Sequence, residues 1–310
     1  MVIDVHTHIF ESLAAFPKVW VDELYQSKVA SLGKEVADRF LAGYDGRVEA
    51  LIKDMDEAGV DKSVVLPLDF AIMCRQEPEI SVWRANEYAA EAQSKYPDRI
   101  IAFAGVDPLR RDAVELLETA VTKWGLKGVK IYPTTFRVTD DVVQPFMKKV
   151  NELEIPALFH QGSDPLPYVI KYGNPVDLDT LTLLYPKMKI IAAHYAPGYE
   201  NILTGILRYK EGRIYADLAL MQGYEWRLSP WHFTMQMRYW MDKFPRSILM
   251  GSDWPFMRRP PVPSHKEWFD IIRNLKIPKQ VLELGLGIKD FTQEEKDMIL
   301  GENARSLLKI

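Results

Sequence analysis

The sequence predicts an α/β fold, a single (β/α)8 barrel (TIM barrel) that forms one domain over residues 1–310. Three observations support this prediction. Eight short runs rich in β-branched residues recur along the chain, segments with helical periodicity separate them, and 310 residues with 47% hydrophobic content suit one large core. Strands that alternate with helices form parallel sheets through crossover connections, and eight such units close into a barrel.

The strands are expected where apolar and β-branched residues form short runs bounded by polar or turn-forming residues. These runs are Val2–His8, Ser63–Leu68, Ile100–Val106, Gly128–Tyr132, Ala157–His160, Lys189–His194, Arg213–Leu218 and Ser247–Asp253.

The intervening helices follow from apolar residues spaced at helical intervals and from terminal signals. They are expected at Arg47–Ala58, Asp112–Trp124, Asp140–Leu153 and Tyr199–Lys210. Glycines after the first two helices mark their ends. Thr292 and Glu295 have the spacing of a capping box, which predicts the start of a final helix.

Two connections are too long for simple loops, so we expect inserts after strands 1 and 7. The first spans Ile9–Gly46 and is rich in aromatic residues, and the second spans Met221–Pro245. Both follow the carboxyl ends of strands, the face where the active sites of barrel enzymes lie, so they could form walls or lids. Trp226, Trp231 and Trp240 of the second insert have helical spacing, which is more typical of core positions.

Composition narrows the function. The net charge of −4 gives no basic surface for nucleic acid or an anionic membrane. No apolar run approaches the roughly 20 residues of a membrane-spanning helix, and no signal peptide is evident. The single cysteine, Cys74, cannot form an internal disulfide. We therefore expect a cytoplasmic protein with a small-molecule substrate, and the sequence leaves open a homo-oligomer.

Two histidines lie close together in strand 1. Because side chains alternate along a strand, His6 and His8 should share a face, with Asp4 one layer deeper on the same face. The opposite face, toward the helices, is then expected to carry Ile3, Val5 and Thr7.

Other candidate ligands end other strands. His160 ends strand 5, His194 ends strand 6 and Asp253 ends strand 8, so four of six histidines lie at or near the carboxyl ends of three predicted strands. Hydrogen bonds to the backbone would explain any one buried histidine, but they explain the whole set poorly. His232 and His265 fall in loop or helix contexts and are expected to be structural.

Six strings along the chain resemble one family when taken together. They are IDVHTHIF, KGVKIYP, HQG, IIAAHYAPG, MGSDWPF and EEKDMILGENARSLL. They resemble the amidohydrolase-related family, which groups metal-dependent hydrolases with non-oxidative decarboxylases similar to aminocarboxymuconate semialdehyde decarboxylase. The likeness runs from strand 1 to the final helix, but it does not extend to the two inserts.

The resemblance implies that His6, His8, His160 and Asp253 bind a divalent cation, usually zinc and otherwise manganese. Three imidazoles and one carboxylate leave a position for water or substrate. The cation would lower the pKa of a bound water toward about 7. Asp253 would accept the proton and later deliver it to the leaving group, and His194 would bind a second metal or act as an acid near the substrate.

Lys130, in the string GVKIYP, has two interpretations. Dihydroorotase-like relatives carry a carbamylated lysine in a similar stretch, which would join His160 and His194 around a second cation. An unmodified ammonium would repel a metal and instead bind a substrate anion or Asp253. We favour one metal and a free ammonium, and a lysine paired with an acidic neighbour is the structural alternative.

Several further residues are candidates for the pocket. Tyr132 and Trp254 adjoin predicted ligands and are expected to line it. Arg137, Arg258 and Arg259 could bind a substrate carboxylate bidentately, although at least one of the last two is expected on the solvated surface.

Two aspartates have open roles. Asp4 could orient a ligand or pair with Lys130. Asp217 ends strand 7 and could face the site, but an aspartate at a strand end commonly caps a helix.

Three functions are compatible with these residues. The leading hypothesis is a hydrolase that activates water on a metal to cleave an amide, ester or lactone. The second is a metal-dependent decarboxylase (carboxy-lyase) of a small aromatic or unsaturated acid, in which Asp253 protonates the carbon that loses carbon dioxide. A non-catalytic binding barrel is the third, although buried ligands without a metal would leave polar groups unsatisfied.

Overall fold

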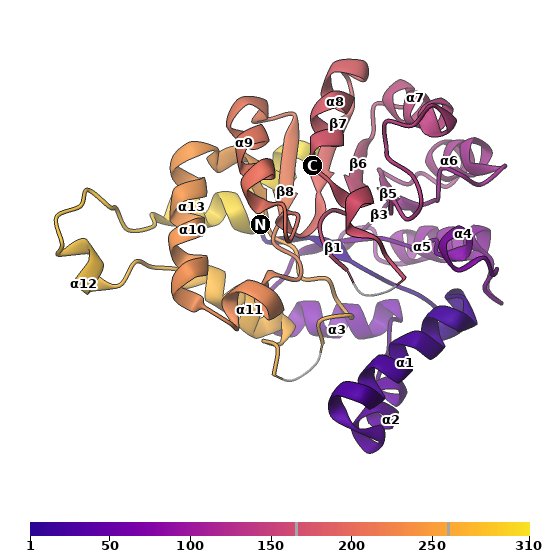
Figure 1. The fold of residues 1–310 in the computed structure, drawn as a ribbon, viewed down its shortest axis with the longest axis horizontal. Helices are drawn as coiled ribbons and strands as arrows, with labels where there is room; N and C mark the ends of the chain where they lie inside the picture. Colours follow the sequence, from indigo (N-terminus) through magenta and orange to yellow (C-terminus); the bar gives the residue numbers. More distant parts are fainter. Residues whose placement is uncertain (165–166, 259–260) are drawn as a thin grey trace.

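Parallel strands surrounded by helices form the fold in the computed structural model, which describes residues 1–164, 167–258 and 261–310 (Figure 1). The strands are β1 (Ile3–Thr7), β2 (Lys62–Val65), β3 (Ile100–Ala102), β4 (Ala104–Gly105), β5 (Val129–Ile131), β6 (Pro156–Phe159), β7 (Lys189–Ala192), β8 (Ile214–Asp217) and β9 (Ile248–Leu249). Each lies within or overlaps a predicted strand. The predicted strand Ile100–Val106 is divided at Phe103 into β3 and β4.

The strands follow the circular order of a (β/α)8 barrel. One ladder has the order β1-β2-β3, the other has the order β4-β5-β6-β7-β8-β9, and all neighbouring pairs are parallel. The two ladders meet at Phe103, the single residue between β3 and β4. The backbone N–H of Phe103 donates to Val65 O at 3.0 Å. Between β9 and β1, Val5 N donates to Met250 O at 2.9 Å and Asp253 N donates to His6 O at 2.8 Å. These two hydrogen bonds link β1 to the segment that follows β9, the last strand. The predicted fold class is confirmed.

Helices form the outer layer and connect successive strands, as expected for crossover units. The connecting helices are α3 (Val48–Ala58), α5 (Val82–Lys95), α6 (Ala113–Thr122), α7 (Gln144–Glu152), α8 (Val176–Leu184), α9 (Glu200–Lys210) and α10 (Pro230–Lys243). The helix α11 (His265–Arg273) follows the last strand, β9. The chain ends in α13 (Gln293–Asp297) and α14 (Asn303–Leu308), and the predicted capping box of Thr292 and Glu295 opens α13. Within the described residues, no helix is long and apolar enough to cross a membrane.

Alternate strand residues fill two separate apolar layers. Val129, Ile131 and their equivalents pack against the helices in the larger cluster. Residues on the opposite faces of the strands fill the barrel interior, and α14 closes one end of it. The residues of this interior cluster are Ile3, Val5, Val64, Leu66, Ile101, Phe103, Leu158, Ile191, Ala193, Tyr215, Leu249, Ala304 and Leu307.

The expected alternation in β1 is wrong. Ile3 and Val5 belong to the interior cluster and do not face the helices. The pairing of β1 with β2 shifts register between Asp4 and Thr7, so an irregularity interrupts the strict two-residue alternation. Consequently Asp4 and His6 make their side-chain contacts in different directions.

The two long connections differ in character. Ile9–Gly46 contains α1 (Lys18–Leu32) and α2 (Lys34–Ala42), which project from the barrel (Figure 1). In contrast, Met221–Pro245 contains α10, the crossover helix between β8 and β9. Trp240 is buried there and stacks on Tyr195 at 3.4 Å between ring centroids.

The tight contact between β4 and the loop after β2 gives a stability test. A Cβ on Gly105 would lie 1.9 Å from the carbonyl oxygen of Pro67, whereas a Cβ on Gly205 in α9 would meet nothing within 4 Å. Gly105→Ala should therefore lower the free energy of unfolding by about 1–3 kcal/mol or more. Gly205→Ala should raise it by about 0.5–1 kcal/mol, because alanine favours a helix. Urea unfolding of both variants measures this, and wild-type stability of Gly105→Ala would contradict the packing.

Candidate metal centre

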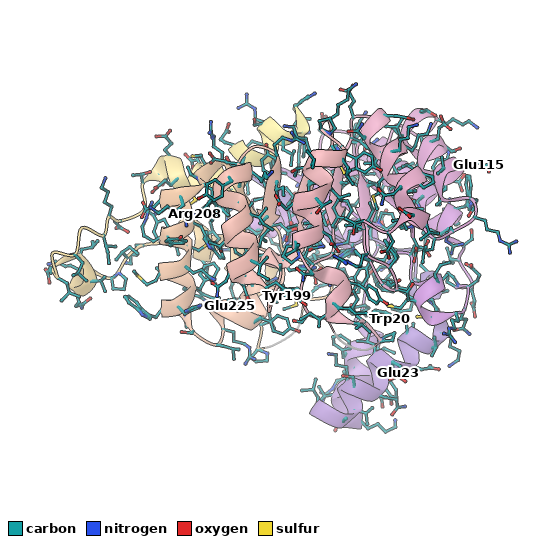
Figure 2. The ribbon with its side chains drawn as sticks, turned by 45° about the horizontal axis from the view of Figure 1, so that its top comes forward. Trp20, Glu23, Glu115, Tyr199, Arg208 and Glu225 are labelled. Atoms are coloured by element: carbon teal, nitrogen blue, oxygen red, sulfur yellow. The ribbon has the colours of Figure 1, made fainter. Side chains whose placement is uncertain are left out.

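A cavity of about 450 Å3 opens at the carboxyl ends of the strands. Its polar floor contains His8, Lys130, His160, His194 and Asp253. Its aromatic walls contain Trp20, Phe40, Tyr44, Phe70, Tyr132, Tyr168 and Phe256. Three of these rings come from α1, α2 and the residues just after them, and Figure 2 shows Trp20 and Glu23 on α1. The segment after β1 therefore forms one wall of the cavity.

Three predicted ligands converge at this floor: His8 and Asp253 line the cavity, and His6, which is fully buried, lies against both of them. His6 Nε2 lies 3.2 Å from His8 Nε2 and 3.6 Å from Asp253 Oδ1, and His8 Nε2 lies 3.1 Å from Asp253 Oδ1. Ligand atoms at about 2.1 Å from one tetrahedral cation would be separated by about 3.4 Å. The three atoms are thus spaced as ligands of one cation would be.

The other ring nitrogen of each histidine is held by a hydrogen bond. His6 Nδ1 donates to Asp217 Oδ2 at 2.8 Å, and His8 Nδ1 donates to Leu66 O at 2.8 Å. In a neutral imidazole, a proton on Nδ1 leaves a lone pair on Nε2. Both Nε2 lone pairs therefore face Asp253, in the arrangement typical of metal-binding histidines.

The electrostatics of the centre favour a cation. Burial, together with the Lys130 ammonium, lowers the pKa of His8 to about 3 and that of His6 well below its usual value. Both imidazoles are therefore neutral at physiological pH. Two lone pairs and a carboxylate oxygen within 3.6 Å of one another repel unless positive charge lies between them. This donor set fits a divalent metal.

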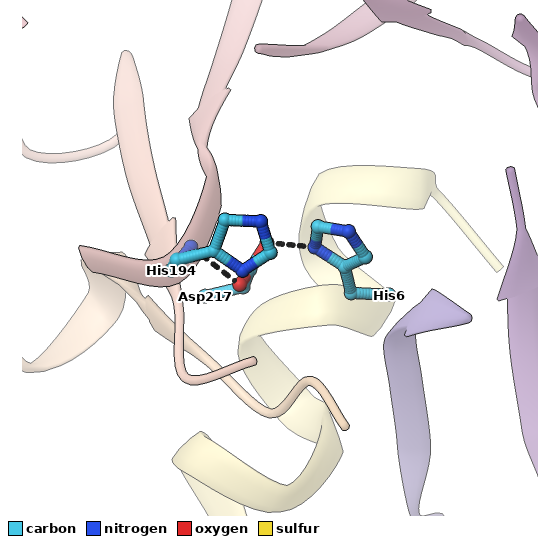
Figure 3. A group of neighbouring side chains, drawn as sticks. All are labelled: His6, His194 and Asp217. Carbon is cyan, nitrogen blue, oxygen red and sulfur yellow. Dashed lines mark hydrogen bonds and ion pairs between the residues drawn. The ribbon is translucent and has the colours of Figure 1, made fainter. Parts of the chain in front are cut away.

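Asp217 links His6 to His194. Its Oδ2 accepts from His6, and its Oδ1 accepts from the His194 backbone N–H at 2.9 Å (Figure 3). The His6 and His194 rings lie 4.6 Å apart, and with Asp217 they form a second group of possible ligands. The alternative role of Asp217 as a helix cap is not what the structure shows.

His160 lies beside the three converging ligands but outside their group. Its ring stacks on Tyr132 at 4.1 Å and lies 5.0 Å from the His194 ring. Its Nε2 is buried without a hydrogen-bond partner among the described residues, and the nearest carboxylate oxygen that forms an ion pair with it, on Asp164, is 3.7 Å away. His160 therefore contributes to the cavity a ring nitrogen that makes no hydrogen bond among the described residues.

Lys130 is buried next to the same ligands. Its Nζ lies 3.3 Å from His6 Nε2. Burial lowers its pKa, and the carboxylates of Asp217, Asp253 and Asp164 oppose that effect. The lysine thus brings positive charge to the edge of the candidate metal centre.

Asp164 is a cavity residue that the sequence did not single out. Tyr132, which lines the cavity as expected, donates its hydroxyl hydrogen bond to this carboxylate. Burial raises the pKa of Asp164 to about 7. Its position four residues after His160, in the loop that follows β6, was the available signal.

Three predicted pocket residues lie elsewhere. Trp254 is buried in the helix-facing layer and donates to Asp54 at 2.8 Å, because the chain turns at the left-handed residue Asp253. Arg137 pairs with Asp177 on α8 and does not line the cavity. Arg258 pairs with Asp54 and borders a separate surface groove. Arg259 lies outside the described residues.

Only one of the two expected roles of Asp4 is excluded, and His265 lies in a helix as expected. Asp4 does not pair with Lys130. Its carboxylate instead lies 2.9 Å from His265 Nε2 on α11. The register shift in β1 accounts for this orientation.

Comparison with known proteins identifies relatives of the whole chain. A family model described as Amidohydrolase matches residues 3–310. No curated protein sequence matches. Among solved structures, a 2,6-dihydroxybenzoate decarboxylase from Rhizobium is similar, with a TM-score of 0.67 and 17% identity over 99% of this chain and 98% of that chain.

Two further structures share the fold at 17% identity. A dihydroxybenzoic acid decarboxylase from Polaromonas sp. JS666, with bound manganese and the inhibitor 2-nitroresorcinol, has a TM-score of 0.66 over 99% of this chain and 96% of that chain. A probable 2-pyrone-4,6-dicarboxylic acid hydrolase from Acinetobacter baumannii, with citric acid bound, has a TM-score of 0.65 over 100% and 99%, respectively.

The hydrogen bond from His6 to Asp217 can be tested directly. Asp217→Asn keeps the size of the side chain but removes the charge that fixes the His6 proton on Nδ1. We expect the affinity for Mn2+ to fall about 10- to 100-fold, as for other partners of metal-binding histidines. Asp177→Asn, at a buried aspartate that pairs with Arg137, is the matched control and should retain wild-type affinity. Equal binding by both variants in a calorimetric titration would contradict this role.

Proposed function

The chain belongs to the amidohydrolase family, and we propose that it is a metal-dependent hydrolase that cleaves an amide, ester or lactone of a small molecule. The observation that carries this proposal is the convergence of His6, His8 and Asp253 beside a buried ammonium, at the floor of a cavity that His8, Asp253 and the ammonium of Lys130 line. Such a centre combines a cation site, a proton acceptor and a second positive charge.

The proposed metal ligands are His6, His8 and Asp253, with His160 as the fourth. The Nε2 of His160 is buried in the same cavity and makes no hydrogen bond among the described residues, which suits a ligand. A divalent cation held there would polarise a substrate carbonyl and lower the pKa of water that it binds. We propose zinc as the metal, and the manganese named for the Polaromonas structure is the alternative.

Asp253 is the proposed proton carrier. Its carboxylate lies at the cavity floor, where it would accept a proton from the attacking water and return it to the leaving group. His194, whose ring lies 4.6 Å from the His6 ring, would act as an acid or electrophile near the substrate. The left-handed backbone at both residues, with φ of 57° and 62°, turns the chain at the strand ends where these side chains lie.

Lys130 is proposed to remain a free ammonium that stabilises negative charge on the substrate oxygen during attack. Its Nζ is close enough to His6 Nε2, at 3.3 Å, to act at the reacting centre. In a carbamylated enzyme, Lys130→Ala would abolish activity and short carboxylic acids would partly restore it.

The cavity walls suggest the kind of substrate. Phe70, Tyr132 and Tyr168 place aromatic rings around the polar floor, with Phe70 and Tyr132 packed edge to face at 5.0 Å. Flat rings bury well against such surfaces. We therefore propose a small, flat substrate whose reacting group faces Lys130 and Asp253.

Decarboxylation is the second candidate because of the same aromatic walls. The similar structures named as decarboxylases act on hydroxylated benzoates according to their names. However, Arg137 and Arg258 do not line this cavity, so among the described residues the substrate carboxylate would be held by Lys130 or Lys28, which do line it. Asp253 would then protonate the carbon that loses carbon dioxide.

Metal content tests the centre itself. Protein purified without added metal should contain about one equivalent of zinc or manganese, since the described ligands surround one position. His8→Ala and His160→Ala should lose the metal and activity. His232→Ala, at an exposed histidine on α10, is the control and should keep both. Mass spectrometry of the metals decides, and metal-free wild-type protein with full activity would contradict the proposal.

Substrate screening separates the two reactions. Lactones, esters and amides should turn over, with loss of at least about 100-fold in kcat for Asp253→Asn because the proton carrier is removed. Hydroxybenzoates should release no carbon dioxide. If instead only aromatic acids react and Asp253→Asn stops carbon dioxide release, hydrolysis is wrong while the metal centre stands.

A further inference from the structure

A buried polar network lies directly behind the candidate metal centre, on the helix side of the strands. It consists of Asp4 on β1, Ser252 after β9 and His265 at the start of α11. All three side chains are buried, with exposed fractions of 0%, 3% and 9%. None of them lines the cavity, so the network cannot contact the substrate directly.

Asp4 is the centre of this network and accepts four hydrogen bonds. Its Oδ1 accepts from the backbone N–H groups of His6 and Ser252, each at 3.1 Å. Its Oδ2 accepts from Ser252 Oγ at 2.5 Å and from His265 Nε2 at 2.9 Å. A buried carboxylate with this many donors is held in one orientation.

These bonds connect the two chain segments that carry the converging ligands. Asp4 holds the backbone of His6 on one side and the backbone of Ser252, the residue before Asp253, on the other. Asp253 N also donates to His6 O at 2.8 Å across the same seam. The spacing between His6 Nε2 and Asp253 Oδ1 therefore depends on how Asp4 is held.

His265 is the member of the network contributed by the helix layer. Its position is fixed independently, because Ser264 and Glu267 form a capping box at the start of α11. Trp268, on the same helix, donates to Gly251 O at 2.9 Å. The helix therefore has one hydrogen bond to the segment after β9 that does not involve Asp4, and His265 makes a separate hydrogen bond to Asp4.

We propose that His265 is a positioning residue for the metal centre, which acts through Asp4 to set the distance between the ligands on β1 and after β9. The proposal rests on the proposed function in that the ligands bind a metal. The role of His265 goes beyond stability, because its hydrogen bond is made to Asp4, whose carboxylate accepts hydrogen bonds from both segments that carry the ligands. Loss of this bond frees Asp4 to rotate and loosens the His6 and Ser252 amides together.

The test compares three variants of the full chain. His265→Leu removes the donor, whereas His265→Gln keeps an N–H group at a similar reach. Trp268→Phe removes a buried hydrogen bond from the same helix to Gly251 without touching Asp4, so it is the matched control for stability. Thermal unfolding confirms that each variant folds at the temperature of the binding measurements.

Two readouts are measured on protein stripped of metal. The first is hydrogen exchange of the His6 and Ser252 amides, which should quicken at least 10-fold in His265→Leu and remain near wild type in the other two variants. The second is the dissociation constant for Mn2+ alone, which should rise about 10- to 100-fold in His265→Leu. His265→Gln should restore it to within about 3-fold of wild type, a loss of less than about 1 kcal/mol.

The outcomes separate this inference from the proposed function. The positioning role is overturned, while the metal centre stands, if wild type binds Mn2+ and His265→Leu binds it with the same affinity. The same conclusion follows if His265→Leu and Trp268→Phe lose equal affinity. If His265→Leu alone quickens exchange at His6 and Ser252 but wild type binds no metal, the positioning of the two segments is supported and the proposed function fails.

Discussion

The buried carboxylate of Asp217 is the interaction on which the polar end of the barrel depends. One oxygen fixes the proton on His6 Nδ1, and the other accepts from the backbone of His194 and of Ala219. The first amide belongs to His194, which has a left-handed backbone conformation, and the second precedes Leu220, which has one too. Each left-handed conformation costs about 1–3 kcal/mol unless surrounding contacts hold it. One side chain therefore orients a ligand and stabilises the strained ends of two neighbouring strands.

The register shift in β1 complements this constraint from the other side of His6. In a regular strand, Asp4 and His6 would share a face, and no pair of short side chains could reach both the cavity and α11. Because the shift separates their directions, His6 contacts Asp217 while Asp4 contacts His265. The His6 ring and the His6 backbone are thus held by two different carboxylates, which restricts the motion of a ligand in a site that must be preorganised.

The sequence predicted the strands and the ligand-bearing residues because both depend on local periodicity. Each of the observed strands lies in or overlaps a predicted run, and His6, His8 and Asp253 meet as the positions of their strand ends required. Errors appeared where orientation depends on nonlocal geometry. Trp254 and Arg137 follow strand ends and were directed by the turns there toward Asp54 and Asp177. Periodicity cannot report such turns, nor the irregularity that brought Asp4 to a distant helix.

The polar floor of the cavity and a large part of its aromatic wall come from different parts of the chain. The polar floor comes from strand ends, where each side chain is fixed by the ladder and by buried partners such as Asp217. A large part of the wall comes from α1 and α2, which project from the barrel and have no equivalent constraint from strand pairing (Figure 1). Changes in that segment can reshape the aromatic wall without moving the proposed metal ligands. Since hydrolysis and decarboxylation need similar floors, the wall after β1 is the part of this enzyme that would determine which molecule reacts.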